Sequence, residues 1–161
     1  MSGRTPLYIA VQKGHLEVIN TLLAAGADPD ASNWDGRPIL HLAVRHDYAE
    51  GIDALLAAGG NPSVRNRENN TPLHIAAADG SLEIINTLLA AGAELEARTI
   101  VLDTPLHWAV LDENPEVVDA LLDAGADLRA RNNSGKRPVD LVDTRSDFAD
   151  TDAFSRLNGG L

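Results

Sequence analysis

Thr71-Pro72-Leu73-His74-Ile75-Ala76-Ala77 decides the fold of this chain, because the sequence returns to that stretch at a fixed interval. Thirty-three residues earlier stands Pro38-Ile39-Leu40-His41-Leu42-Ala43, and thirty-three before that stands Thr5-Pro6-Leu7-Tyr8-Ile9-Ala10. Thirty-three residues later the chain reads Thr104-Pro105-Leu106-His107-Trp108-Ala109, and a degenerate fifth copy follows as Arg137-Pro138-Val139-Asp140-Leu141-Val142. Self-similarity at a period of this size is the signature of a repeat architecture, so the chain is best interpreted unit by unit.

Each unit predicts two short helices. In the third copy, Thr71 is a good N-cap, Pro72 suits the first helical turn, and Gly80 ends the first helix. A second helix is expected to begin at Ser81 as its N-cap, to carry apolar residues at helical spacing, and to end at Gly92. Two helices of this length cannot bury a core alone, so we expect the stability to come from stacking of the units.

Three motifs resemble those of ankyrin repeats: the Thr-Pro-Leu-His-x-Ala opening, the Gly-His-Leu-Glu-Val second-helix start at 14–18, and the Leu-Leu-x-x-Gly-Ala-Asp close. The resemblance covers almost the whole chain, from about Gly3 to Val142. It implies an all-α fold, a slightly curved solenoid of stacked helix-turn-helix units with projecting β-hairpin-like loops, whose concave side carries the loop tips and first helices. We expect one domain over 1–161, with repeats at approximately 1–33, 34–66, 67–99 and 100–132 and a C-terminal cap at 133–161.

Composition narrows the classes of function. The net charge is −11 and the chain contains no cysteine. An acidic surface repels phosphate backbones, so nucleic acid is not an expected partner. No apolar run reaches the roughly 18 residues of a membrane span, and thiolate metal sites are excluded. The N-terminus enters the first repeat at once and leaves no room for a signal peptide, so we expect a cytoplasmic monomer.

The histidines and carboxylates do not form a catalytic pattern. His41, His74 and His107 occupy one position of the repeat, and a helix-packing distance of roughly 8–10 Å separates neighbouring copies. Ligands of one metal ion lie far closer together, so this row cannot chelate. The resemblance implies instead that this histidine braces the turns by hydrogen bonds. No phosphate-binding loop, Ser-His-Asp order or metal-binding helix motif is present, so we expect no enzyme, metal or cofactor.

The basic residues are distributed unevenly along each unit. None of the 13 Lys and Arg residues falls in the second helices of the first four repeats, whereas the loops carry most of them. Arg65, Arg98 and Arg131 share one repeat position and should form a ladder along the loop bases. The concave side is therefore expected to be mixed to basic and the convex side acidic. Two interpretations stay open: loops need solvating charge, or the groove attracts an acidic partner.

Apolar residues at two loop tips depart from the repeat pattern. Trp34 occupies one tip, and Ile100-Val101-Leu102 replaces the usual Asp and Gly at another. These three residues either pack toward the Trp34 side of the groove or contact a partner, and Leu111 would extend the patch. The predicted partner-binding residues are Trp34, Arg37, Arg45, His46, Arg65, Arg67, Asp79, Arg98, Ile100, Val101 and Leu111.

The expected function is non-catalytic binding of another protein through the concave face. One alternative is a dedicated inhibitor or immunity protein that blocks a single enzyme with the same surface. Another is a targeting domain excised from a larger protein, suggested by the lack of a polar cap before Thr5. The sequence does not identify the partner, because a fold does not imply a function.

Overall fold

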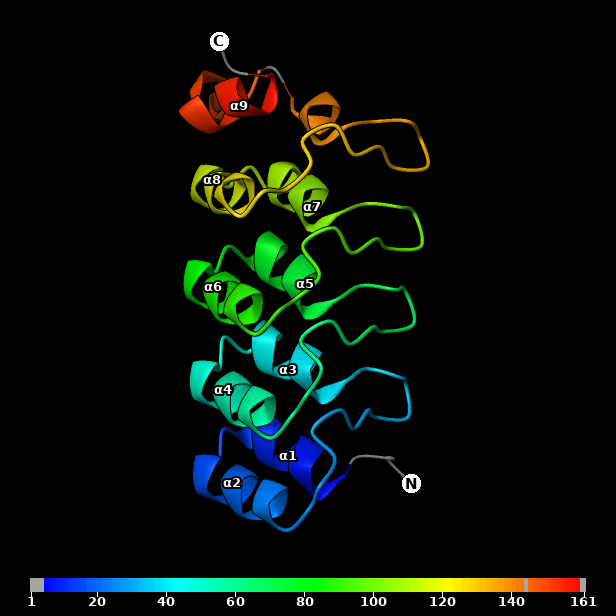
Figure 1. The fold of residues 1–161 in the computed structure, drawn as a ribbon, viewed down its shortest axis with the longest axis vertical. Coiled ribbons are helices and arrows are strands. Elements are labelled where there is room, and N and C mark those ends of the chain that lie inside the picture. Colours follow the sequence, from blue (N-terminus) through cyan, green and yellow to red (C-terminus); the bar gives the residue numbers. More distant parts are fainter. Residues whose placement is uncertain (1–4, 144, 160–161) are drawn as a thin grey trace.

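The computed structural model describes residues 5–143 and 145–159 and shows stacked helix pairs. The pairs are α1 (Pro6–Lys13) with α2 (Leu16–Ala24), α3 (Ile39–Arg45) with α4 (Ala49–Ala57), α5 (Pro72–Asp79) with α6 (Leu82–Ala90), and α7 (Pro105–Leu111) with α8 (Pro115–Asp123). Two 3₁₀ helices, η1 (Pro138–Leu141) and η2 (Asp147–Asp150), and α9 (Asp152–Leu157) complete the described chain. Figure 1 shows the pairs as successive layers, with long loops projecting from one side. The expected all-α solenoid is confirmed.

The projecting loops are less regular than β-hairpins. Within residues 5–143 and 145–159 no strand is formed, and one isolated bridge joins Ser32 to Pro38. The loop of the third layer shows why. The Asn69 N–H donates to the Asn66 carbonyl at 3.0 Å, and the Asn66 N–H donates to the Asn70 carbonyl at 3.1 Å. The chain then enters α5, so a ladder of strand bonds has no room to extend.

The helix starts show one expected cap and one that differs. The Thr71 hydroxyl and His74 side chain form a reciprocal capping box at the start of α5, and Gly80 ends that helix with φ 81°. At the start of α6, by contrast, the Ser81 side chain makes no cap hydrogen bond. Its hydroxyl donates to the Asp47 carboxylate of the preceding layer at 3.0 Å. Ser81 therefore occupies the predicted N-cap position, but its side chain does not cap the helix, because the hydroxyl binds a carboxylate of the neighbouring layer.

The core runs continuously between the layers. α5 is buried at all of its first six positions. The second helices bury one stripe each, in which Ile19, Ile52, Ile85 and Val118 occupy one repeat position and are fully buried. The opposite faces of these helices remain in solvent. Apolar contact between layers is thus the main stabilising interaction, as the short helices require.

The last layer is covered by η2 and α9. Phe148 and Leu157 are buried, and the ring of half-buried Phe154 meets that of Phe148 edge-on at 6.5 Å. Arg156 forms ion pairs with Asp119 at 2.5 Å and Asp123 at 2.6 Å on α8. Exposed ion pairs contribute little stability, so the aromatic contacts hold this end in place.

Leu102 has a left-handed backbone, with φ 63°, at a position that Gly36 and Gly135 occupy in other loops. Leu102→Gly is expected to raise the unfolding free energy by about 1 kcal/mol, because a left-handed conformation is strained for a residue with a Cβ. Denaturant unfolding at pH 7 measures the change. Leu102→Ala serves as the control, since it keeps the strained Cβ and should leave stability close to that of the parent. A destabilised Leu102→Gly variant would contradict this account of the strain.

Candidate functional site

A buried histidine ties each first helix of the middle layers to the loop of the next layer. The Nε2 atoms bond backbone carbonyls at 2.8, 3.1 and 3.1 Å, in the pairs His41–Asn70, His74–Asp103 and His107–Lys136. In α5 the Thr71 N–H donates to His74 Nδ1 at 3.2 Å, so that nitrogen is an acceptor and Nε2 carries the hydrogen. The prediction that these histidines brace the turns is confirmed.

His41 lacks half of this arrangement. Pro38 stands where Thr71 stands in the next repeat, and proline supplies neither an N–H nor a hydroxyl. His41 Nδ1 is consequently buried without a hydrogen-bond partner. Burial lowers the pKa of His41 to about 4; the bond to Asn70 raises it, and the positive charges of Arg45 and Arg37 lower it further. The imidazole is therefore neutral at pH 7.

Pro38→Thr is expected to raise the unfolding free energy by about 1 kcal/mol. The new N–H and hydroxyl would both reach His41 Nδ1, each bond contributing ~1 kcal/mol, and the loss of proline rigidity would offset ~0.5–1 kcal/mol. Chemical denaturation at pH 7 measures the sum. Pro38→Ala supplies the N–H without the hydroxyl, so its stability should lie below that of Pro38→Thr. If the two variants were equally stable, the hydroxyl would have no role.

The arginine ladder is present and braces the loops. Arg65 donates to the Arg98 carbonyl at 3.1 Å, and Arg98 donates to the Arg131 carbonyl at 3.0 Å. Arg65 also pairs with Glu94 at 2.6 Å. The predicted ladder is confirmed, and its guanidinium groups are engaged within the protein. Arg65 and Arg98 are thus less available to a partner than their exposure in the loops suggests.

We call the boundary between two neighbouring loops a seam. The seam between the loops that precede α3 and α5 is joined differently from the next two seams. Farther along, Ile100 N–H donates to the Glu68 carbonyl at 3.1 Å and Asn133 N–H to the Val101 carbonyl at 2.9 Å. Among the described loops, no equivalent bond runs from Arg67 N–H to Asp35. The Arg67 guanidinium instead donates to the Trp34 carbonyl at 2.9 Å.

The ladder also stops at this seam. Ser32 occupies the position that corresponds to Arg65, and its short side chain cannot span the distance to the next loop. The seam therefore lacks both the backbone bond at the tip and the arginine at the base. This is the place where the loops leave space between them.

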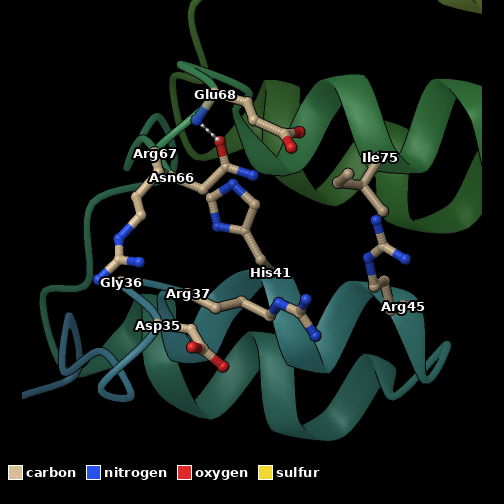
Figure 2. A pocket seen from close by; sticks show the side chains of 9 residues that line it. All are labelled: Asp35, Gly36, Arg37, His41, Arg45, Asn66, Arg67, Glu68 and Ile75. Atoms are coloured by element: carbon tan, nitrogen blue, oxygen red, sulfur yellow. Dashed lines mark hydrogen bonds between the residues drawn. The ribbon is translucent and has the colours of Figure 1, made fainter.

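A pocket of about 200 Å³ lies in this seam, with His41 at its centre (Figure 2). α3 supplies His41 and Arg45, α5 supplies Ile75, and the two loops supply the rest of the lining: Asp35, Gly36, Arg37, Asn66, Arg67 and Glu68. The side chains of Arg37 and Arg45 form no hydrogen bond or ion pair within residues 5–143 and 145–159. The structure thus brings together three of the predicted arginines, Arg37, Arg45 and Arg67, around one opening.

The other predicted residues lie outside this pocket. Arg45 and Asp79 also line a shallower depression beside Asp47 and Ser81. His46 is exposed at the C-terminal end of α3, and Leu111 is 54% exposed at the end of α7. These positions are accessible, but the described contacts do not join them into one site.

The two apolar tips are both open to solvent. Trp34 is 64% exposed, and Ile100 and Val101 are 67% and 41% exposed. They lie on loops two layers apart, with the loop that bears Arg67 between them (Figure 1). The tip of the fourth layer therefore does not pack on Trp34. The expectation that this tip packs toward Trp34 is wrong, and contact with a partner stays a prediction.

Sequence reasoning did not identify the pocket itself. It assigned His41 to bracing and did not single out Asp35 or Glu68, which stand at ordinary loop positions. The available signal was a pair of departures in one unit, Ser32 at the ladder position and Pro38 at the capping position. Ser32 lacks the side-chain bond to the next loop that Arg65 makes, and Pro38 lacks the bonds that Thr71 makes to His74 within its own unit.

No arrangement of three or more His, Cys, Asp or Glu side chains suited to a metal ion occurs in the part of the chain that the structure describes. In the same part, no helix is long and apolar enough to cross a membrane.

Comparison with protein families agrees with the architecture. A model described as ankyrin repeats in three copies matches residues 40–132, and a single ankyrin-repeat model matches residues 2–34. A search of curated proteins returned no match. The family models together span more than half of the sequence and coincide with the stacked helix pairs, and on this ground the chain belongs to the ankyrin repeat family.

Proposed function

We propose that this protein is a non-catalytic module that binds an acidic partner protein on the face formed by its loop tips and first helices. Ankyrin repeats generally serve as protein–protein interaction modules. The proposal rests on Arg37 and Arg45, which lie on the same face as the exposed tips. Their side chains form no hydrogen bond or ion pair with the described residues. The second helices of the first four repeats carry no basic residue, so they offer an acidic partner no such contact.

The two kinds of residue have complementary roles in such a contact. Arginine and tryptophan are the residue types most enriched among those that dominate binding energy, and Trp34 and Arg45 are both exposed. Opposite charge steers association and fixes orientation. A stable contact buries on the order of 800 Å² on each partner, an area that requires several neighbouring loop tips. We therefore expect affinity to fall as salt concentration rises.

The test is affinity capture from the source organism by the immobilised chain and by a Trp34→Ala, Arg45→Glu, Val101→Asp triple variant. Arg45 is chosen over Arg98 because Arg98 braces a loop, so replacing it would also disturb the structure. The triple variant should bind the captured partner at least ~100-fold more weakly, since truncation of a dominant contact residue costs 2 kcal/mol or more, roughly 30-fold, and three are changed.

A matched control changes similar residues away from that face: Leu82→Ala, Arg129→Glu and Val18→Asp. All three are exposed and lie outside the loop tips and first helices. Equal loss of binding in both triple variants would contradict the proposal. If the partner is an enzyme, its activity in the presence of the chain then distinguishes an inhibitor from a simple binding module.

A further inference from the structure

We infer that the pocket between the loops that precede α3 and α5 binds one carboxylate, the side chain of a glutamate on the partner, through Arg37 and Arg45, with Arg67 adding positive charge to the lining. This inference rests on the proposed function and specifies the chemical group that is recognised. It uses residues that the repeat pattern does not require, since the corresponding seams of the next two layers are closed by backbone bonds between the loop tips.

The size of the pocket suits a side chain. Sites for small molecules and cofactors generally measure roughly 300–1,000 Å³, whereas this pocket measures about 200 Å³. Ile75, which is 3% exposed, forms an apolar part of the lining. The two methylene groups of a glutamate side chain can pack against it while the carboxylate reaches the arginines. Aspartate has one methylene fewer and would make less of this contact.

Three arginines line the pocket: Arg37 and Arg45 end on one side of His41, and Arg67 ends on the other side beside Gly36 (Figure 2). Arg37 comes from the loop that precedes α3, Arg45 from the end of α3, and Arg67 from the loop that precedes α5. The bond from Arg67 to the Trp34 carbonyl holds that side chain against Gly36, so Arg67 contributes positive charge to the lining while Arg37 and Arg45 contact the carboxylate. A guanidinium presents paired N–H donors that match the two oxygens of a carboxylate.

The acidic residues in the lining set the charge of the ligand. Asp35 and Glu68 stand beside the three arginines, and Glu68 accepts a hydrogen bond from the Asn70 side-chain amide at 3.1 Å. Three positive and two negative groups leave one net positive charge, which a singly charged carboxylate neutralises. A doubly charged phosphate would exceed that balance and would be repelled by both fixed carboxylates. The lining therefore favours a carboxylate over a phosphorylated residue.

His41 contributes shape rather than charge. Its ring is 1% exposed and its unpaired Nδ1 is buried, so the imidazole forms the floor of the pocket without reaching the opening. The neighbouring charges of Arg45 and Arg37 oppose its protonation, as does burial.

The test uses the folded chain and a glutamate blocked at both ends as N-acetyl and N-methylamide. Nuclear magnetic resonance should show saturable shifts in the Nε–H signals of Arg37 and Arg45 and in the amides of Arg67 and Glu68. Blocked glutamine, which has the same shape without the charge, should cause none of them. Arg45→Gln should weaken blocked-glutamate binding at least tenfold. Arg129→Gln removes one positive charge elsewhere and should change the binding less than twofold.

Three results would overturn the inference: equal shifts with blocked glutamine, equal weakening by Arg45→Gln and Arg129→Gln, or tighter binding of blocked phosphoserine than of blocked glutamate. Arg45 is exposed, so circular dichroism should show that its variant remains folded. The measurement needs no partner protein. If glutamate fails to bind here while the triple variant still loses the captured partner, the carboxylate pocket is wrong and the proposed function stands. If capture is insensitive to the triple variant, the proposed function fails by itself.

Discussion

Acidification from pH 7 to pH 5 is expected to lower the free energy of unfolding by about 4 kcal/mol, through two buried histidines. Burial lowers the pKa of both His41 and His74 from 6.5 to about 4, and these rings are 1% and 0% exposed. Their hydrogen bonds to backbone carbonyls raise the pKa values, but burial outweighs that effect. Unfolding exposes the rings to water, where they take up a proton near pH 6.5.

The sign follows from the lowered pKa of the folded state. The contribution of the two neutral histidines to stability is complete above pH 6.5 and is lost as the pH falls toward 4. In this range the unfolded chain binds protons at these rings and the folded chain does not. At pH 5 each histidine accounts for about 2 kcal/mol of that loss. Asp140 does not add to it, because Arg137 lowers the pKa of this carboxyl to about 2, so its contribution is lost only below about pH 4.

The measurement is denaturant unfolding at pH 7 and pH 5 with the ionic strength held constant. A His41→Gln, His74→Gln double variant keeps a side-chain donor at each position and removes both titrating groups. Its stability should change by less than about 1 kcal/mol over the same interval, because both groups that cause the expected loss have been removed. A double variant as acid-sensitive as the parent would show that other groups cause the loss.

Much of the fold followed from one repeated stretch of sequence. The period fixed the position of each helix pair, and the shared position of Arg65 and Arg98 predicted their ladder, because neighbouring layers place equivalent residues side by side. Trp108 stands at the repeat position of the buried Ile75, and it is half-buried with its ring edge-on to His74 at 5.4 Å. Such predictions succeed where a contact repeats with the layers.

Contacts that do not repeat were not predictable in the same way. The bond from Ser81 to Asp47 depends on where one loop places a carboxylate, which local propensity does not determine. The pocket arises where Ser32 and Pro38 remove bonds present in other units, so it depends on how two loops separate in space. Both departures are visible in the sequence, but local pattern does not show that the space left by the missing bonds lies between the same two loops.

Replacement of single histidines by leucine is expected to have very different effects in α5 and α3. His74→Leu would leave the buried Thr71 N–H and hydroxyl without His74 Nδ1 as their partner, would remove one of the two hydrogen bonds to the Asp103 carbonyl, and should cost about 4 kcal/mol at pH 7. His41→Leu would remove one of the two hydrogen bonds that the Asn70 carbonyl accepts, the other coming from the Asn66 N–H, and should cost about 1 kcal/mol while also removing the unpaired Nδ1. Each variant is the control for the other, since both make the same substitution in a buried ring position. Denaturant unfolding at pH 7 measures both costs, and equal values would show that packing, rather than the number of hydrogen bonds, sets the contribution of this histidine.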